Sequence, residues 1–412
     1  MSSNARRVVV TGVAGITALG DTWERIESNL RNNVSCIARM PEWDRFIGLN
    51  TRLGGPIQGF KTPPHYTRKV TRTMGRVSLL ATWATELALK DAGLFDDPEI
   101  RSGAMGVAYG SCTGSTDAIR DFGTMIASGD VAGINATTYL RLMPHTAAAN
   151  IGVHFGLKGR VIPACSACTS GSQSIGYAYE AIKYGRVPMM VAGGAEELCP
   201  SEAAVFDTLY ATSTLNDSPS NTPKPFDRDR DGLVIGEGAG TLVLEEYEHA
   251  RARGARIHAE LIGFGSNSDG DHLTHPNSDT MRVAMELALA DAGLDPASIG
   301  YVNAHATATE QGDIAETHAM HKLFGSRIPV SSLKGHIGHT LGACGAIESM
   351  VSIHMMNTNW FAPTLNLQNV DERCGEVDYI MNGGRELDVE YVMNNNFAFG
   401  GVNTSLVFRR VA

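Results

Sequence analysis

The sequence predicts an α/β fold built from two similar halves. An amphipathic segment at residues 86–94 ends in Gly-Leu and returns at residues 286–294 with almost the same residues. Each copy leads into an apolar strand, at residues 103–109 in the first half and 299–304 in the second. Strands and helices alternate through both halves, which is typical of a sheet covered by helices. The shared helix and its shared exit into a strand favour duplication over chance similarity.

Length and composition indicate a globular protein with a large core. The chain has 412 residues, which we divide into halves at residues 1–252 and 253–412. The formal net charge of −10 argues against general nucleic-acid binding. No apolar run is long enough to span a bilayer, and we expect no signal peptide at the start. Seven irregularly spaced cysteines do not form a disulfide framework, which indicates a cytoplasmic protein.

The first half opens with an apolar strand at residues 8–12. This strand ends at Gly12, but the GxGxxG spacing of a dinucleotide-binding loop is absent. Residues 67–76 then predict a helix that carries four cations at helical spacing: Arg68, Lys69, Arg72 and Arg76. On an acidic protein, this face is either a functional surface or an ordinary solvated one.

Cys168 follows a strand and a turn of small residues, and it precedes a helix predicted at residues 172–184. Free backbone N–H groups and the positive end of the helix dipole stabilise a thiolate in such a place, and the same N–H groups can bind an oxyanion. We therefore expect the pKa of Cys168 to lie below that of a buried cysteine. The alternative is an inert cysteine of the core.

The second half supplies histidines at the ends of strands. His305 ends the strand at residues 301–304, and His336 and His339 lie in a glycine loop after Ser331 and Ser332. Chemistry in α/β folds often lies at the carboxyl ends of strands. A glycine-rich turn between the strands at residues 391–394 and 404–408 can point an N–H group at a substrate. Each histidine taken alone is more often structural than catalytic.

Three other interpretations fit the residues less well. Cys165 and Cys168 have CxxC spacing, but no second pair completes a zinc site. A metal cluster of His305, His336 and His339 lacks an acidic partner of the HExxH type. The glycines at residues 236–240 indicate close packing at a bend, because no Lys-Ser/Thr follows as in a phosphate loop.

With Cys168, His305 and His339 identified, the sequence resembles the elongating β-ketoacyl-acyl-carrier-protein synthases of the thiolase superfamily, almost from end to end. The resemblance is carried by residues 166–171, 302–305, 334–343 and 397–401. Thiolases have a second cysteine near the C-terminus, and none follows Cys374 here. Chain-initiating synthases have asparagine in place of the second histidine, and chain-length-factor subunits lack the cysteine.

The resemblance implies a thiolase-like, five-layered α-β-α-β-α fold made of two duplicated halves. It implies a cytoplasmic acyltransferase that forms an acyl-Cys168 thioester and condenses it with malonyl-carrier protein, with loss of CO₂. No cofactor is required, because phosphopantetheine arrives on the acyl carrier protein. A homodimer, or a dimer with a related subunit, is implied as well. The alternative is a non-catalytic, chain-length-factor-like or structural subunit of a ketosynthase heterodimer.

The resemblance also implies roles for individual residues. His305 and His339 would donate to the enolate oxygen, and Lys334 with Glu348 would form a supporting ion pair. The N–H groups of Cys168 and Phe399 would form the oxyanion hole, and Phe399 would be the gate. Other residues would have more peripheral roles. Thr307 and Thr309 would bind the pantetheine arm, Phe206 and Thr113 would line the acyl pocket, and Lys69 and Arg72 would dock the carrier protein. A structural monovalent cation would be bound by Asn303, Glu348, Asn395 and Asn396.

The acyl substrate stays open at this point. Departures from the family's usual residues, such as Ala306 after the first histidine and Ala398 between two phenylalanines, leave the chemistry intact but affect the surroundings of the acyl chain. Housekeeping fatty-acid elongation is one option. Synthesis of polyenes or other secondary products, such as aryl polyenes, is the other.

Overall fold

The computed structural model describes residues 5–411, and a continuous eleven-stranded sheet is its framework. The strand order is β12-β10-β9-β14-β15-β8-β1-β7-β6-β4-β5. These strands are β1 (Val8–Thr17), β4 (Met105–Gly110), β5 (Val161–Ala164), β6 (Met189–Glu196), β7 (Gly238–Glu246), β8 (Ala259–Ser268), β9 (Tyr301–Asn303), β10 (Pro329–Ser331), β12 (Asp378–Tyr379), β14 (Tyr391–Ala398) and β15 (Val402–Arg409). Two small sheets pair β2 (Ala38–Arg39) with β3 (Leu53–Gly54), and β11 (Trp360–Phe361) with β13 (Arg385–Glu386).

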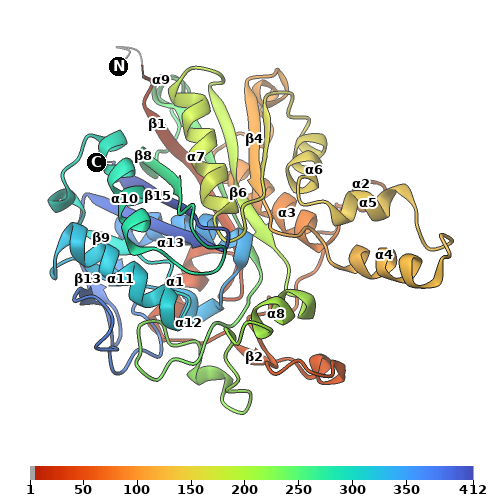
Figure 1. The fold of residues 1–412 in the computed structure, drawn as a ribbon. Helices are drawn as coiled ribbons and strands as arrows, with labels where there is room; N and C mark the ends of the chain where they lie inside the picture. The colour runs from red at the N-terminus through yellow and green to blue at the C-terminus, as the bar shows by residue number, and fades with distance from the viewer. Residues whose placement is uncertain (1–4, 412) are drawn as a thin grey trace.

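The helices form three layers around the two halves of this sheet (Figure 1). They are α1 (Trp23–Arg31), α2 (Arg68–Thr71), α3 (Arg76–Asp91), α4 (Asp117–Ser128), α5 (Ala136–Leu142), α6 (Thr146–Phe155), α7 (Ser170–Lys183), α8 (Pro200–Asp207), α9 (Tyr247–Ala252), α10 (Ser278–Ala292), α11 (Glu310–Phe324), α12 (Lys334–Ile337) and α13 (Cys344–Thr358). The first half contributes β1, β7, β6, β4 and β5, with α3 and α6 outside them. The second half contributes the other six strands, with α10 and α11 outside.

Helices α7 and α13 form the middle layer. Helix α7 packs on β4 and β6, α13 packs on β7 and β14, and the two helices contact each other. The halves meet along one edge, where residues 8–10 of β1 pair with residues 259–261 of β8. The predicted five-layered fold of two halves is therefore confirmed. The division after residue 252 stays a prediction, and it coincides with the end of α9.

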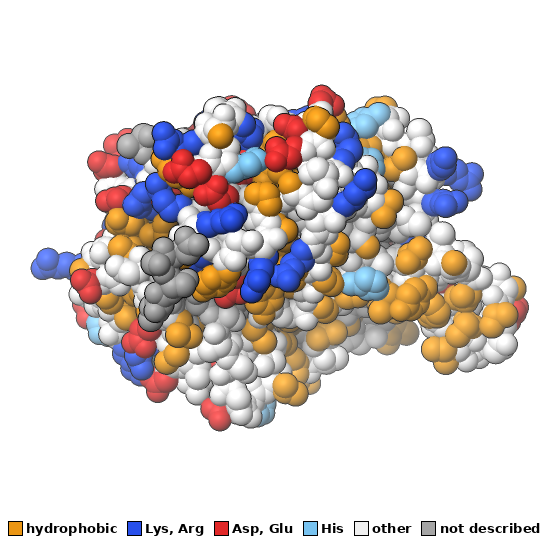
Figure 2. Space-filling model, turned by 90° about the horizontal axis from the view of Figure 1, so that it is seen from above, with side chains coloured by type: hydrophobic (Ala, Val, Ile, Leu, Met, Phe, Trp, Pro, Cys, Tyr) orange, Lys and Arg blue, Asp and Glu red, His pale blue; other side chains and the backbone are white. Residues whose placement is uncertain are grey.

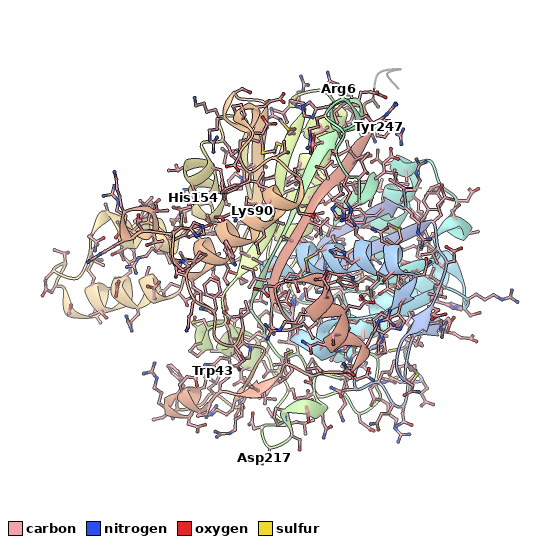
Figure 3. The ribbon with its side chains drawn as sticks, turned by 180° about the vertical axis from the view of Figure 1, so that it is seen from behind. Arg6, Trp43, Lys90, His154, Asp217 and Tyr247 are labelled. Atoms are coloured by element: carbon pink, nitrogen blue, oxygen red, sulfur yellow. The ribbon has the colours of Figure 1, made fainter. Side chains whose placement is uncertain are left out.

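The sequence repeat occupies equivalent outer positions. Helix α3 packs on β1 and β7, and α10 packs on β8 and β15. Gly93 and Gly293 follow the two helices with φ of +68° and +69°, a conformation that glycine adopts without steric cost. In the view from behind (Figure 3), the labelled Lys90 of α3 and His154 of α6 mark the outer layer of the first half.

The predicted helix at residues 67–76 is wrong in its extent. Helix α2 ends at Thr71, and a new helix, α3, begins at Arg76. Gly75 separates them because its backbone is extended, and a Cβ at this position would approach the Ser115 side chain to 2.2 Å. Arg76 forms an ion pair with Glu237, so the four cations do not share one helical face.

Strand β1 is also longer than predicted. It passes through Gly12 with an irregular register and continues to Thr17. Within residues 5–411, no helix is both long enough and apolar enough to cross a membrane.

Candidate active site

Cys168 lies in a tight turn at the start of α7. Ala167, the preceding residue, has φ of +51°, which is a strained conformation for a residue with a Cβ. Ser170 holds this turn, because its Oγ donates to the Ala167 carbonyl at 2.7 Å and accepts from the Ser166 N–H at 2.9 Å. The turn presents the sulfur of Cys168 at the helix N-terminus, as the strand–turn–helix pattern predicted.

Two glycines let the two halves meet at Cys168. A Cβ on Gly171 of α7 would lie 2.9 Å from the Gly342 carbonyl oxygen. A Cβ on Gly345 of α13 would lie 2.8 Å from the Ser172 nitrogen. The N-termini of α7 and α13 therefore approach more closely than side chains would permit. This approach brings Cys168 beside the histidine loop of the second half.

Cys168 and two of the predicted histidines form one cluster. The His339 Nε2 lies 3.0 Å from the Cys168 Sγ. The rings of His305 and His339 are 5.0 Å apart between centroids and nearly perpendicular. His336 lies elsewhere, because its two ring nitrogens contact the carbonyl oxygens of Val34 and Pro363. The metal cluster that included His336 does not form.

The neighbours of His305 determine which of its nitrogens carries the proton. The Lys334 Nζ and the Asn396 Nδ2 each lie 3.4 Å from the His305 Nδ1. Both are donors, so Nδ1 must accept and the proton must be on Nε2. Burial, and then the charge of Lys334, hold the pKa of His305 well below its usual value. His305 is therefore a neutral ring with an N–H to donate.

His339 is also neutral, but its proton is less restricted. Burial and Lys334 hold the pKa of His339 well below its usual value. Within residues 5–411, its Nδ1 has no hydrogen-bond partner. No neighbour fixes one tautomer, so Nε2 can accept from the Cys168 thiol in one step and donate in another.

Lys334 and Glu348 form the predicted ion pair. Both side chains are buried, and Asn396 donates from Nδ2 to the second oxygen of Glu348 at 2.7 Å. Burial acts to lower the pKa of Lys334, but the Glu348 carboxylate outweighs it and the pKa is raised. Removing one partner of such a pair typically costs about 3–5 kcal/mol, because the other charge stays buried and unpaired.

The pKa of Cys168 lies below that of the other buried cysteine, Cys344, as expected, but it still lies above the usual value of a cysteine. Burial raises the pKa of Cys168 to about 11, although Lys334 and the backbone N–H groups of Phe399 and Cys168 act to lower it. Desolvation of the thiolate therefore outweighs the helix N-terminus. The resting group is a thiol that can donate to the His339 Nε2.

We expect alkylation of Cys168 by iodoacetamide to speed up about tenfold for each pH unit between pH 7 and pH 9. Only the thiolate reacts, and its fraction rises in this way while the pH is below the pKa. Peptide mapping of the modified protein at each pH gives the rate at Cys168 alone. A rate that levels off below pH 8 would show that the helix N-terminus prevails over burial.

Glu316 supports His305 and was not predicted. Its two oxygens accept from the backbone N–H groups of His305 and Ala306, at 2.8 and 2.7 Å. Burial raises the pKa of Glu316 to about 8. The carboxyl group thus holds the loop after β9 through backbone atoms, and no spacing of residues reveals such a contact.

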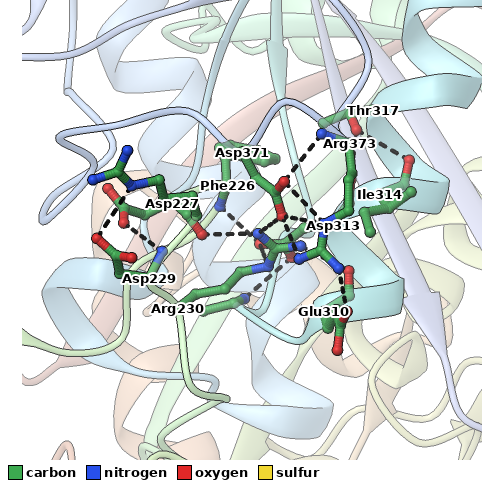
Figure 4. A network of polar contacts seen from close by, with 12 residues as sticks. Phe226, Asp227, Asp229, Arg230, Glu310, Asp313, Ile314, Thr317, Asp371 and Arg373 are labelled. Atoms are coloured by element: carbon green, nitrogen blue, oxygen red, sulfur yellow. Dashed lines mark hydrogen bonds and ion pairs between the residues drawn. The ribbon is translucent and has the colours of Figure 1, made fainter.

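Arg230 and Asp313 hold the adjoining loop, which contains Thr307 and Thr309 (Figure 4). The Arg230 guanidinium donates to the carbonyl oxygens of Thr309 and Glu310 and pairs with the Asp371 carboxylate at 2.7 Å. Asp313 accepts from the N–H groups of Ala308 and Phe226. Burial raises the pKa of Asp313 to about 6, although Arg230 acts to lower it.

A cavity of about 440 Å³ leads to this cluster. Cys168, His305 and His339 line its inner part, and the hydroxyl-bearing Thr307 and Thr309 line its wall. The hydroxyl oxygens of these two threonines are 3.0 Å apart. Phe206 and Phe399 also line it, with their rings tilted against each other at 5.2 Å.

Other predicted residues lie outside this cavity. Thr113 does not line it, and its hydroxyl donates to a carboxyl oxygen of Glu202 at 2.7 Å. Lys69 and Arg72 do not line it either, and both are exposed. Neither forms an ion pair with an acid among residues 5–411.

The four residues predicted for a cation do not converge on one point. Neighbouring residues of a strand point to opposite faces, so Asn395 points away from Asn396. Asn395 contacts Ser405 and Met285, whereas Asn396 contacts Glu348. The Asn303 Oδ1 is buried without a partner among the described residues, and a cation at these four residues stays a prediction.

Two trios offer metal-ligand atoms within 4.8 Å of one another: Cys168, His305 and His339, and His305, Cys344 and Glu348. The ammonium group of Lys334 lies beside both trios, because it is 3.4 Å from the His305 Nδ1 and forms an ion pair with Glu348. This buried positive charge disfavours a further cation at either trio.

Comparisons with known proteins agree with this geometry. The profile "Beta-ketoacyl synthase, N-terminal domain" matches residues 5–250, and "Beta-ketoacyl synthase, C-terminal domain" matches residues 258–368. The 3-oxoacyl-[acyl-carrier-protein] synthase 2 of Vibrio cholerae is 38% identical, over 98% of this chain and 99% of the relative.

Two solved structures extend the comparison. A β-ketoacyl synthase from Burkholderia phymatum STM815 is 58% identical with a TM-score of 0.98, covering 99% of this chain and 100% of that one. The ketosynthase ApeO in complex with its chain length factor ApeC, from Xenorhabdus doucetiae, gives 25% identity and a TM-score of 0.86, covering 98% of each chain.

Proposed function

Because the chain belongs to the β-ketoacyl synthase family, we propose that Cys168, His305 and His339 carry out the condensation that defines this family. The chain is an acyltransferase that condenses an acyl-enzyme with malonyl-carrier protein during chain elongation. The observation that carries the assignment of residues is the 3.0 Å contact between the Cys168 Sγ and the His339 Nε2, beside the neutral ring of His305.

In the first step the acyl group moves from the carrier protein to Cys168. The Cys168 Sγ attacks the thioester carbonyl and passes its proton to the His339 Nε2. The carbonyl oxygen becomes an oxyanion, which the N–H groups of Cys168 and Phe399 stabilise. When the intermediate collapses, the thiolate of the carrier protein leaves and takes the proton from His339. One acyl–sulfur bond forms and one breaks.

In the second step malonyl-carrier protein loses CO₂. The electron pair of the breaking C–C bond moves into the thioester carbonyl and forms an enolate. Its oxygen accepts from the Nε2–H groups of His305 and His339, which are neutral donors. The enolate carbon attacks the acyl-Cys168 carbonyl, the Cys168 thiolate leaves, and a proton restores the thiol. Thr307 and Thr309 offer hydroxyls along the cavity to the pantetheine arm.

A reconstituted reaction tests this function. Purified chain, acyl-carrier protein and malonyl-carrier protein should yield a β-ketoacyl-carrier protein whose chain is two carbons longer, detected by mass spectrometry. A chain-length-factor-like subunit would yield no product. The acyl groups to compare are saturated fatty acyl chains and polyenes, including aryl polyenes, because both substrate options stand.

Carrier-protein docking at Lys69 and Arg72 is supported by their exposure on α2 and by the absence of acidic partners among residues 5–411. We expect the double variant Lys69→Glu, Arg72→Glu to raise KM for acyl-carrier protein about tenfold or more at low salt, with little change in stability. Exposed charges contribute little to folding but steer association with an acidic partner.

The matched control is Arg186→Glu, Arg327→Glu, which makes the same charge change at two other exposed arginines. Screening by salt, over about 8 Å at physiological strength, should reduce the difference between the two double variants. Equal KM values for wild type and the Lys69, Arg72 variant at low salt would place the docking surface elsewhere.

A homodimer is supported by the surface of the first half. Strand β5 is an edge of the sheet, and Val161 on it is 49% exposed. The arm of α4 and α5 projects from the body (Figure 1) and exposes Ile126 and Val131, and the lobe at the right of Figure 2 is rich in hydrophobic side chains. Unpaired edges and apolar patches of this kind are typical of interfaces.

Light scattering should report twice the mass of one chain. A monomer would contradict this, and a dimer formed only on co-expression with a related subunit would favour a heterodimer.

We also place the reaction in the cytoplasm, where seven free thiols such as these persist.

A further inference from the structure

Buried carboxyl groups, Glu196 and Glu202, lie near the Phe206–Phe399 pair, with Glu202 on the same helix as Phe206. The Thr113 hydroxyl links two of them, because it donates to the Glu202 Oε1 at 2.7 Å and lies 3.4 Å from the Glu196 Oε1. Glu196 also accepts from the N–H groups of Cys112 and Gly342 and from the Ser111 hydroxyl. None of these carboxyl groups has a part in the condensation described above.

One carboxyl oxygen of Glu202 has no hydrogen-bond partner among the described residues. Its side chain is almost fully buried, with the residue 5% exposed, and its Oε2 has no partner among residues 5–411. Burial, and then the charge of Glu196, raise the pKa of Glu202 well above its usual value, which favours the neutral acid. Since Oε1 accepts from Thr113, the proton is on Oε2. This O–H is a buried donor without an acceptor, which is disfavoured unless a ligand supplies one.

The helix that carries Glu202 also forms the wall of the cavity. Glu202 and Phe206 are four residues apart on α8, so they lie on one face, one turn from each other. Phe206 lines the cavity and packs on Phe399. Cys112, next to Thr113, packs in the same apolar cluster as Phe206 and Phe399. Glu202 therefore lies one helical turn from a ring that lines the cavity.

We propose that Glu202 and Thr113 form a polar site beyond the cavity, which an acyl chain reaches by passing the Phe206–Phe399 pair and which selects chains that carry an uncharged hydroxyl group at the end remote from the thioester. This rests on the proposed function, in which Cys168 holds the acyl chain. A hydroxyl oxygen accepts from the Glu202 Oε2–H. A methyl end would leave that donor unpaired, and a carboxylate end would meet two acidic residues, Glu196 and Glu202. An ammonium end would lose its hydration beside a neutral acid.

The test compares pairs of acyl-carrier proteins whose chains match in heavy-atom number and end in either a hydroxyl or a methyl group. Acylation of Cys168 is followed by mass spectrometry across a series of lengths. At the length that reaches Glu202, wild type should prefer the hydroxyl chain about tenfold or more, because a site built to bind a hydroxyl rejects the analogue that lacks it.

Three variants test whether Glu202 causes the preference for the hydroxyl chain. Glu202→Leu should reverse it toward the methyl chain, and Glu202→Gln, which keeps an N–H donor, should retain part of it. Glu197→Gln is the matched control: Glu197 is equally buried and its pKa is also raised by burial, but it binds Thr116 instead of Thr113. It should keep the wild-type ratio. The ratio of hydroxyl-chain to methyl-chain acylation is measured within each variant, so it does not depend on the variant's overall activity. If Glu202→Leu does not fold, Glu202→Gln still tests the proposal.

The outcomes separate this inference from the proposed function. A short acyl chain that stops before Phe399 is tested first on wild type, and failure to acylate Cys168 would overturn the proposed function. If the short chain reacts but no length shows a hydroxyl preference, or Glu202→Leu keeps the wild-type ratio, only the polar site is overturned. Preference for an ammonium or carboxylate end would overturn it as well, because it requires Glu202 to be charged or absent from the site.

Discussion

Replacing Cys168 with glutamine is expected to abolish acyl loading and condensation while malonyl-carrier protein still loses CO₂. An amide is not a nucleophile, so turnover to β-ketoacyl product should fall by about 10⁴-fold or more, as when the nucleophile of a catalytic triad is removed. Its carbonyl group can occupy the oxyanion hole formed by the N–H groups of residues 168 and 399, in place of the acyl-cysteine carbonyl. His305 and His339 remain to bind the enolate oxygen.

The measurements for this variant are ¹⁴CO₂ release and product formation. The control is Cys165→Gln, which makes the same change three residues away at an exposed thiol. It should still load acyl groups and condense. A Cys168→Gln protein that releases no CO₂ would show that decarboxylation needs the thiol, and the separation of the two half-reactions would be wrong.

His305→Ala should show the opposite loss. Decarboxylation should fall by about 10²–10³, because one of two donors to the enolate oxygen is gone. Acyl loading of Cys168 should persist, because the thiol contacts His339 and not His305. His305→Asn should recover part of the CO₂ release, since a side-chain N–H can replace the donor without being a base.

Rapid-quench measurement of acyl-enzyme and of ¹⁴CO₂ distinguishes these outcomes. Equal loss of both steps in His305→Ala would indicate a collapsed site. A thermal unfolding curve would reveal this collapse as a lower unfolding temperature, because the buried Lys334–Glu348 pair lies nearby. Full CO₂ release from a folded His305→Ala protein would remove His305 from the decarboxylation step.

Much of the architecture was predictable because it repeats. The segments at residues 86–94 and 286–294 became α3 and α10 in equivalent layers, and the turn before Cys168 followed from a strand, small residues and a helix. The break in the helix at residues 67–76 was not predictable, because Gly75 is extended and packs closely against Ser115, forty residues away.

The side chains proposed to react could be predicted from the sequence, but the residues that hold them in position could not be predicted as well. Cys168, His305 and His339 stand in strand–turn patterns, whereas Glu316 and Asp313 act through backbone N–H groups that no pattern reveals. One signal existed: these two acids are three residues apart on α11, on the buried face with Ala315 and Ala319. The helix-dipole argument placed the pKa of Cys168 below that of the buried Cys344, but it could not predict that burial raises the pKa above its usual value, because burial is a property of the whole fold.

Strand alternation in residues 394–396 bears on the cation site, which stays a prediction. Asn394 and Asn396 share one face of β14, and Asn395 lies on the other. The resemblance grouped Asn395 with Asn396, and the alternation separates them.

The most direct test of the central claim is to find where the acyl group is attached. The protein is incubated with acyl-carrier protein without malonyl-carrier protein, quenched in acid, digested and analysed by tandem mass spectrometry. We predict one acyl group per chain, on the peptide and at the sulfur of Cys168. An acyl group on Cys165 or Cys344, or a folded protein that acquires none, would contradict the assignment of Cys168 as the nucleophile.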